Sequence, residues 1–144
     1  MARAITDPLL SRPVPAFDPL AAFFWESGAD DQLRILRCGG CGLYIHPPSH
    51  PCPQCFSTEL APTVVSGDCT VATCTVNVQQ WVAGQRPYSI AIVELDEQHG
   101  LRLTSNVVGC DPNEVHIGQR VRVSFIHRNN IYYPVFVHAG GDDR

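Results

Sequence analysis

Apolar and polar residues alternate over much of the second half of the chain. In one such run Val121, Val123 and Phe125 fall on one side, while two arginines and a serine fall on the other. This period-two pattern is typical of a strand with one solvated face. Similar runs, separated by turn-prone segments, indicate five strands in this half. They lie at residues 69–78, 88–95, 101–108, 119–126 and 131–137.

A short helical turn is expected between the third and fourth of these strands. The segment Asp111-Pro112-Asn113-Glu114 has the residue order of a capping box, and Gly118 follows closely enough to end the turn. Five short strands with a helical plug after the third strand predict a small Greek-key barrel of the OB type.

The first half of the chain begins with a different pattern. Asp18-Pro19 can start a helix and Gly28 can end it, so we expect a short amphipathic helix at residues 18–27. Its aromatic residues, Phe23-Phe24-Trp25, need a surface to pack on. Both their own domain and a partner protein remain possible surfaces. The proline-containing residues before the helix predict an extended arm.

Four cysteines form two Cys-x-x-Cys knuckles, which are separated by ten residues and are flanked by expected strands at residues 32–37 and 60–66. The ligands are Cys38, Cys41, Cys52 and Cys55. Four thiolates complete the tetrahedron that zinc prefers, and a closed site of this kind is structural, not catalytic. A rubredoxin-like iron site is the alternative. We expect the nearby His46 and His50 to have surface or supporting roles.

The other three cysteines, Cys69, Cys74 and Cys110, are expected to be buried thiols without nucleophilic function. Because Cys69 and Cys74 are five residues apart on one expected strand, we place them on opposite faces.

Composition excludes several classes of enzyme. All ten basic residues are arginine, so the chain cannot form a Schiff base or supply the lysine of a P-loop. No motif pairs a nucleophile with a base, and we predict no catalytic residue. The net charge of −4 gives no overall attraction for nucleic acid. No signal peptide or membrane-spanning run is apparent, so a cytoplasmic location is expected.

The longest loop between expected strands has the composition of a recognition surface. Trp81, Arg86 and Tyr88 lie together in or beside it, and aromatic residues with arginine are typical of binding sites. We predict that these three residues bind the ligand, although Tyr88 could equally anchor the core. The Asp96-Glu97 pair is expected to be a solvated turn.

The order of these motifs resembles that of the acyl-CoA-associated family of small proteins. The resemblance covers most of the chain from Pro13 to Val137 and implies a mainly β protein with a helical arm, a rubredoxin-like zinc ribbon and a five-stranded OB-fold barrel. The expected parts are an arm and helix (1–31), the ribbon (32–66), the barrel (67–138) and a loose tail (139–144). The residues that carry the resemblance are Asp18-Pro19, Phe24-Trp25-Glu26, Leu33 to Arg37, His46-Pro47-Pro48, Cys52-Pro53-Gln54-Cys55, Pro87-Tyr88, Val93 to Asp96, Asn106 to Cys110, Ile117-Gly118, Val121-Arg122-Val123 and Pro134-Val135-Phe136.

The resemblance also implies a function. Members of this family bind thiolase-superfamily enzymes or MaoC-like hydratases that act on CoA thioesters. The His46-Pro47-Pro48 form is most similar to members that accompany thiolase-like aldolases, which cleave steroid or bile-acid side-chain CoA thioesters by a retro-aldol step. We therefore expect a non-catalytic zinc subunit, in a heteromer around an enzyme dimer, that supports assembly and acyl-CoA binding. The alternatives are a nucleic-acid-binding module, a hydratase accessory subunit and a stand-alone acyl-CoA-binding protein.

Overall fold

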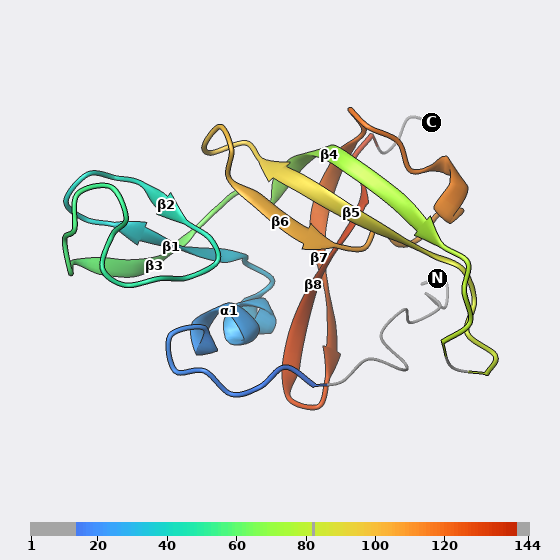
Figure 1. The fold of residues 1–144 in the computed structure, drawn as a ribbon, viewed down its shortest axis with the longest axis horizontal. Helices are drawn as coiled ribbons and strands as arrows, with labels where there is room; N and C mark the ends of the chain where they lie inside the picture. The colour runs from blue at the N-terminus through green and yellow to red at the C-terminus, as the bar shows by residue number, and fades with distance from the viewer. Residues whose placement is uncertain (1–13, 82, 141–144) are drawn as a thin grey trace.

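The computed structural model describes residues 14–81 and 83–140, and it divides into a small ribbon and a larger barrel (Figure 1). The expected arm falls largely outside these residues, as do the last four residues of the expected tail. The ribbon is a three-stranded antiparallel sheet in the order β2-β1-β3. Its strands are β1 (Arg34–Cys38), β2 (Tyr44–Ile45) and β3 (Leu60–Val64).

The barrel is a curled five-stranded antiparallel sheet in the order β6-β5-β4-β7-β8. The segment that follows β6 at one edge reaches β8 at the other edge through a parallel bridge between Val107 and Phe136. The short helical turn η2 (Pro112–Glu114) lies between the third and fourth strands, with the Asp111 side chain accepting the Asn113 N–H. The mainly β, OB-type fold is thus confirmed. The strands are β4 (Asp68–Asn77), β5 (Tyr88–Leu95), β6 (Arg102–Ser105), β7 (Arg120–Arg128) and β8 (Ile131–His138).

A β-bulge in β4 changes which side chains face the core. Val71 pairs with Val93 but Thr73 pairs with Ile92, so β4 holds one extra residue between these pairs. The extra residue reverses the alternation of inward and outward side chains. Cys74 therefore packs against the same core as Cys69. The expectation that these two thiols face opposite sides is wrong.

The N-terminal helix is displaced from its expected position. It comprises α1 (Ala22–Glu26) and the 3-10 turn η1 (Ser27–Asp30). The Asp18 carboxylate accepts the Leu20 N–H at 3.0 Å, which stabilises a turn before the helix and does not cap it. Gly28 does not end the helix either: a Cβ there would lie 2.5 Å from Phe125 Cδ1, so this glycine allows close packing against the β7–β8 hairpin.

The aromatic residues of α1 pack on their own domain. Phe24 is 6% exposed within the main hydrophobic core, and Phe23 and Trp25 pack partly buried against it. Phe24 also contacts the His46 ring at a centroid distance of 5.0 Å, and Trp25 contacts the Tyr133 ring at 5.8 Å. The helix therefore packs between the ribbon and the barrel. Of the two surfaces considered for its aromatic residues, their own domain and a partner protein, the structure shows the first.

The turn between β5 and β6 fastens the ribbon to the barrel. The Gln98 side chain accepts the Tyr44 N–H at 2.9 Å and donates to the Tyr44 carbonyl at 3.1 Å. The Glu97 carboxylate accepts the Ser66 N–H at 2.7 Å, in the segment that joins the two parts. Asp96 forms a two-pronged ion pair with Arg120. Asp96 and Glu97 thus lie in a turn, as expected, and Asp96 is exposed, but their carboxylates also make contacts that the sequence does not predict.

Within the described ranges, no helix is long and apolar enough to cross a membrane.

Candidate metal centre and recognition loop

The two knuckles bring four sulfur atoms together at one end of the ribbon. The Sγ atoms of the four cysteines all lie within 4.8 Å of one another. Across the knuckles, Cys38 Sγ lies 3.5 Å from Cys55 Sγ, and Cys41 Sγ lies 3.7 Å from Cys52 Sγ. Cys38 and Cys52 are buried, whereas Cys41 and Cys55 are exposed. One cysteine of each knuckle is thus anchored in the ribbon core and the other faces outward.

Backbone N–H groups donate hydrogen bonds to two of these sulfur atoms. Cys38 Sγ accepts the N–H groups of Gly40 and Cys41, at 3.3 and 3.5 Å, and Cys52 Sγ accepts that of Gln54 at 3.4 Å. The hydrogen bond from the Cys41 N–H lowers the pKa of Cys38 to about 6. The N–H of Cys55 likewise lowers the pKa of Cys52. Cysteine binds zinc as the thiolate, and backbone N–H groups directed at the sulfurs of Cys38 and Cys52 stabilise that negative charge, so the closed four-cysteine cluster fits structural zinc.

The two histidines near the knuckles are outside this cluster. The His46 ring packs on Phe24, and burial lowers its pKa. His50 is exposed. Among the described residues that could hold a metal, the four cysteines form the one group of three or more.

The remaining three thiols are associated with the barrel core. Burial raises the pKa of Cys69 to about 12, and it also raises the pKa of Cys110. Cys74 Sγ donates to the Val115 carbonyl at 3.6 Å and packs against the core. All three thiols lie in the barrel core or pack against it, as expected of buried thiols.

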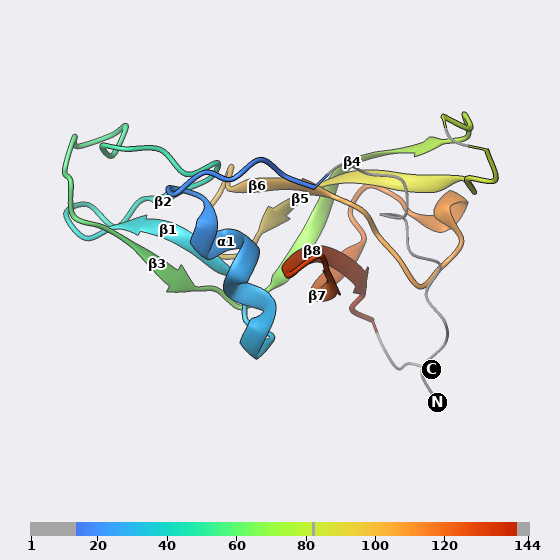
Figure 2. The same ribbon diagram turned by 90° about the horizontal axis from the view of Figure 1, so that it is seen from below.

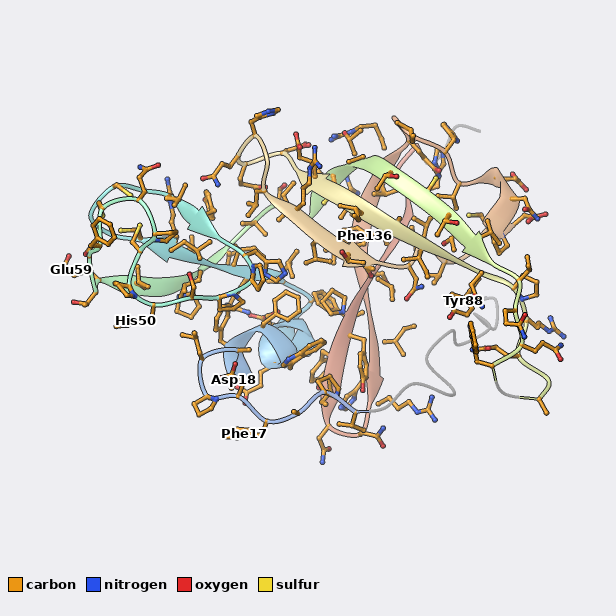
Figure 3. The ribbon with its side chains drawn as sticks, in the orientation of Figure 1. Phe17, Asp18, His50, Glu59, Tyr88 and Phe136 are labelled. Carbon is orange, nitrogen blue, oxygen red and sulfur yellow. The ribbon has the colours of Figure 1, made fainter. Side chains whose placement is uncertain are left out.

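The predicted ligand residues lie together at the tip of the β4–β5 hairpin. Trp81 is 73% exposed, and its Nε1 donates to Asn77 Oδ1 at 3.2 Å. Arg86 is exposed, while Tyr88 is half-buried at the start of β5, opposite Asn77. Figure 3 shows Tyr88 at the opposite end of the molecule from Glu59 in the ribbon. The recognition loop is therefore remote from the metal centre, and its ligand-binding role stays a prediction.

Three of the four arginines on the barrel strands form ion pairs with carboxylates. Arg102 pairs with Glu94 at 3.3 Å, Arg120 with Asp96 at 2.6 Å and Arg122 with Asp68 at 3.0 Å. Nucleic-acid binding by an OB fold requires a basic groove with stacking aromatic residues. The surface formed by these three ion pairs is not such a groove.

Two exposed aromatic residues were not singled out by the sequence. Phe17, before the helix, is 84% exposed, and Phe56, directly after the second knuckle, is 74% exposed. Phe56 has a left-handed backbone (φ 63°), and its N–H bonds to the Cys52 carbonyl. Because Phe56 directly follows the zinc ligand Cys55 in a tight turn, the sequence contains a signal that its side chain is exposed.

Comparison with known proteins gives the same two parts. The rubredoxin-like zinc ribbon domain of ChsH2 matches residues 25–61, and the C-terminal OB-fold domain of ChsH2 matches residues 63–125. The structure matches a chain of the solved Ltp2-ChsH2(DUF35) aldolase with a TM-score of 0.78 and 33% identity. That match covers 88% of this chain and 99% of the other.

Two curated relatives are named as alpha subunits of hydratases that act on CoA thioesters. The chain is 34% identical over 131 residues to a probable enoyl-CoA hydratase alpha subunit of Thermomonospora curvata, covering 90% of this chain. It is 38% identical over 106 residues to the 3-oxo-4,17-pregnadiene-20-carboxyl-CoA hydratase alpha subunit of Mycobacterium tuberculosis, covering 73% of this chain. It spans only 40% and 33% of the lengths of those two proteins.

A third relative, a DUF35 domain-containing scaffold protein of Methanothermobacter thermautotrophicus, is 34% identical over 97 residues. That match covers 65% of this chain and 71% of the relative. The chain therefore belongs to the DUF35 family, and its zinc ribbon and OB-fold domains are of the ChsH2 type.

Proposed function

We propose that the chain is the non-catalytic, zinc-containing subunit of a thiolase-superfamily aldolase. The complex cleaves the side chain of a steroid or bile-acid CoA thioester by a retro-aldol step. The observation that carries this proposal is the match to the ChsH2 chain of the Ltp2-ChsH2 aldolase, which extends over 99% of that chain. The likeness therefore covers the zinc ribbon and the OB fold together and not one of them alone.

The chemistry of the described residues supports an accessory role. Retro-aldol cleavage needs a general base for the β-hydroxyl group and a means of stabilising the departing enolate. The chain has no lysine for an imine, and its four-cysteine cluster has no ligand position left for substrate. We assign the base and the enolate-stabilising groups to the enzyme subunit.

A second candidate is an accessory subunit of a MaoC-like enoyl-CoA hydratase. The names of the two hydratase alpha subunits among the relatives favour it. The two functions differ in their products: hydration adds water to the acyl chain, whereas retro-aldol cleavage breaks a carbon–carbon bond and shortens it.

Co-purification distinguishes these functions. The tagged chain is expressed in its native host, the retained enzyme is identified by mass spectrometry, and both proteins are purified separately and together. We expect the isolated chain to leave steroid side-chain CoA thioesters unchanged and the complex to shorten them. Cleavage by the isolated chain would contradict the proposal, as would full activity of the enzyme without it. A hydrated product of unchanged carbon number would favour the hydratase.

The recognition loop predicts a specific effect on substrate binding. We assign Arg86 to a phosphate of CoA, with Trp81 and Tyr88 beside it. Arg86→Ala should raise the KM of the complex for its thioester by about tenfold, because a hydrogen bond to a charged group is lost, and leave kcat unchanged. Arg102→Ala, which removes an arginine already paired with Glu94, is the matched control and should leave KM unchanged. Equal KM values for both variants would remove Arg86 from the binding site.

A further inference from the structure

The outer face of β5 carries partly exposed aliphatic side chains in the middle of the strand. Ser89, Ala91, Val93 and Leu95 point into the core, so the alternate residues point outward. Two of these, which we term the β5 stripe, are the half-buried Ile90 and Ile92. On the neighbouring strand, exposed Thr75 lies opposite Ile90 and exposed Thr73 lies opposite Ile92.

The main contacts of β5 lie within the sheet and on its inner side. Besides its strand neighbours β4 and β6, β5 packs mainly against η2. The inward-facing Cys74 donates to the carbonyl of Val115, the residue directly after η2. This hydrogen bond places the end of η2 on the inner side of the sheet. Figure 2 shows β5 and β6 along the upper side of the barrel, with β7 and β8 below them. An outer strand face with aliphatic residues is typical of a surface that another molecule covers.

Charge around the β5 stripe limits what that molecule can be. Toward β6 and β7 the same face carries Glu94, Arg102 and Arg120, which are engaged in ion pairs within the chain. At the other end, exposed Arg86 has no ion pair among the described residues. The complementary surface is therefore apolar over most of its extent and brings an anionic group to Arg86.

The position of the stripe agrees with the way OB folds bind their ligands. These folds use the outer face of their second and third strands and the loop between the first two, which here are β5, β6 and the β4–β5 hairpin tip. Nucleic acid would require free cations and stacking aromatic residues. Isoleucine and threonine beside paired arginines instead favour a folded protein surface.

We infer that the β5 stripe is the docking surface for the enzyme subunit. This inference rests on the proposed function and adds the surface by which the two subunits meet. The enzyme contributes an apolar surface that covers Ile90 and Ile92, and a phosphate of its bound CoA thioester lies against Arg86. The hairpin tip then borders the entrance through which the thioester reaches the enzyme.

Lysine substitutions test the surface directly. Ile90→Lys and Ile92→Lys place a charge in the apolar interface, and Thr75→Lys does so from an exposed position without removing an apolar side chain. Affinity for the aldolase subunit that co-purifies with the wild-type chain is measured by calorimetry with purified proteins. We expect each variant to lose at least about tenfold in affinity. Val64→Lys, at an exposed β-branched position on β3, is the matched control and should bind like wild type.

The outcomes separate this inference from the proposed function. Zinc content and melting temperature equal to those of the wild type establish that a variant is folded. If the wild-type chain binds the aldolase and Thr75→Lys binds it equally well, the stripe is not the docking surface, although the proposed function stands. If the wild-type chain retains no CoA-thioester enzyme, both are overturned. Tight, salt-sensitive binding of single-stranded RNA that the lysine substitutions strengthen would also overturn the inference.

Discussion

Replacing Cys52 with alanine should abolish zinc binding and unfold the ribbon. Cys52 is fully buried, and its Sγ lies 3.7 Å from that of Cys41. Alanine removes one of four thiolates and leaves the site open to water. Structural zinc sites of this kind contribute roughly 10–16 kcal/mol, which becomes available only as the ligands assemble. A three-strand sheet as small as this ribbon has little other core, mainly Leu36, Ile45 and the buried cysteines.

Metal analysis and limited proteolysis measure the effect. The wild-type chain should carry one zinc ion, whereas Cys52→Ala should carry none and should be cleaved within residues 32–66. Cys74→Ala is the matched control, because Cys74 is a thiol of the barrel core, and it should retain zinc. A metal-free but protease-resistant ribbon would contradict the prediction, and bound iron in protein grown with both metals available would contradict the choice of zinc.

Replacing Phe24 with alanine should destabilise the whole chain by about 3–5 kcal/mol, the usual cost of emptying a phenylalanine site in a core. Phe24 contacts Trp25 at a ring centroid distance of 5.1 Å and His46 at 5.0 Å, so the cavity would open between the ribbon and the barrel. The free energy of unfolding is obtained from urea denaturation followed by circular dichroism.

Phe17 provides a matched control for this substitution. It is the same residue type only seven positions earlier, but it is 84% exposed. Phe17→Ala should change stability by no more than about 0.5 kcal/mol. Similar losses for both variants, or a loss below 1 kcal/mol for Phe24→Ala, would show that the helix does not hold the two parts together.

The features that the sequence predicts well depend on residues close together in the chain. Each knuckle is a four-residue unit, so spacing alone identifies the metal ligands. Strand positions follow from alternation, as in Val121, Val123 and Phe125. The β4 bulge also leaves a signal in the sequence: apolar residues at Cys69 and Val71 are followed by others at Cys74 and Val76, which changes the alternation from odd to even positions.

Other features depend on residues that are distant in sequence. Asp96 and Glu97 are engaged by groups 24 and 31 residues away, which no local pattern can indicate. Gly28 suits the end of a helix by residue type, but its actual role depends on Phe125 and Tyr132 in the β7–β8 hairpin. The outward direction of Ile90 and Ile92 likewise requires the register of the sheet, because both faces of β5 are apolar in sequence.

The Gln98 contact has a consequence for how members of such a family can diverge. Its amide bonds to the peptide groups of Tyr44 and makes no demand on the side chain at that position. The Tyr44 side chain packs against the main core and beneath Arg37, so a substitution at position 44 alters that packing while the peptide contact with Gln98 can persist. One tie between ribbon and barrel is in this way independent of the residue type on the ribbon side.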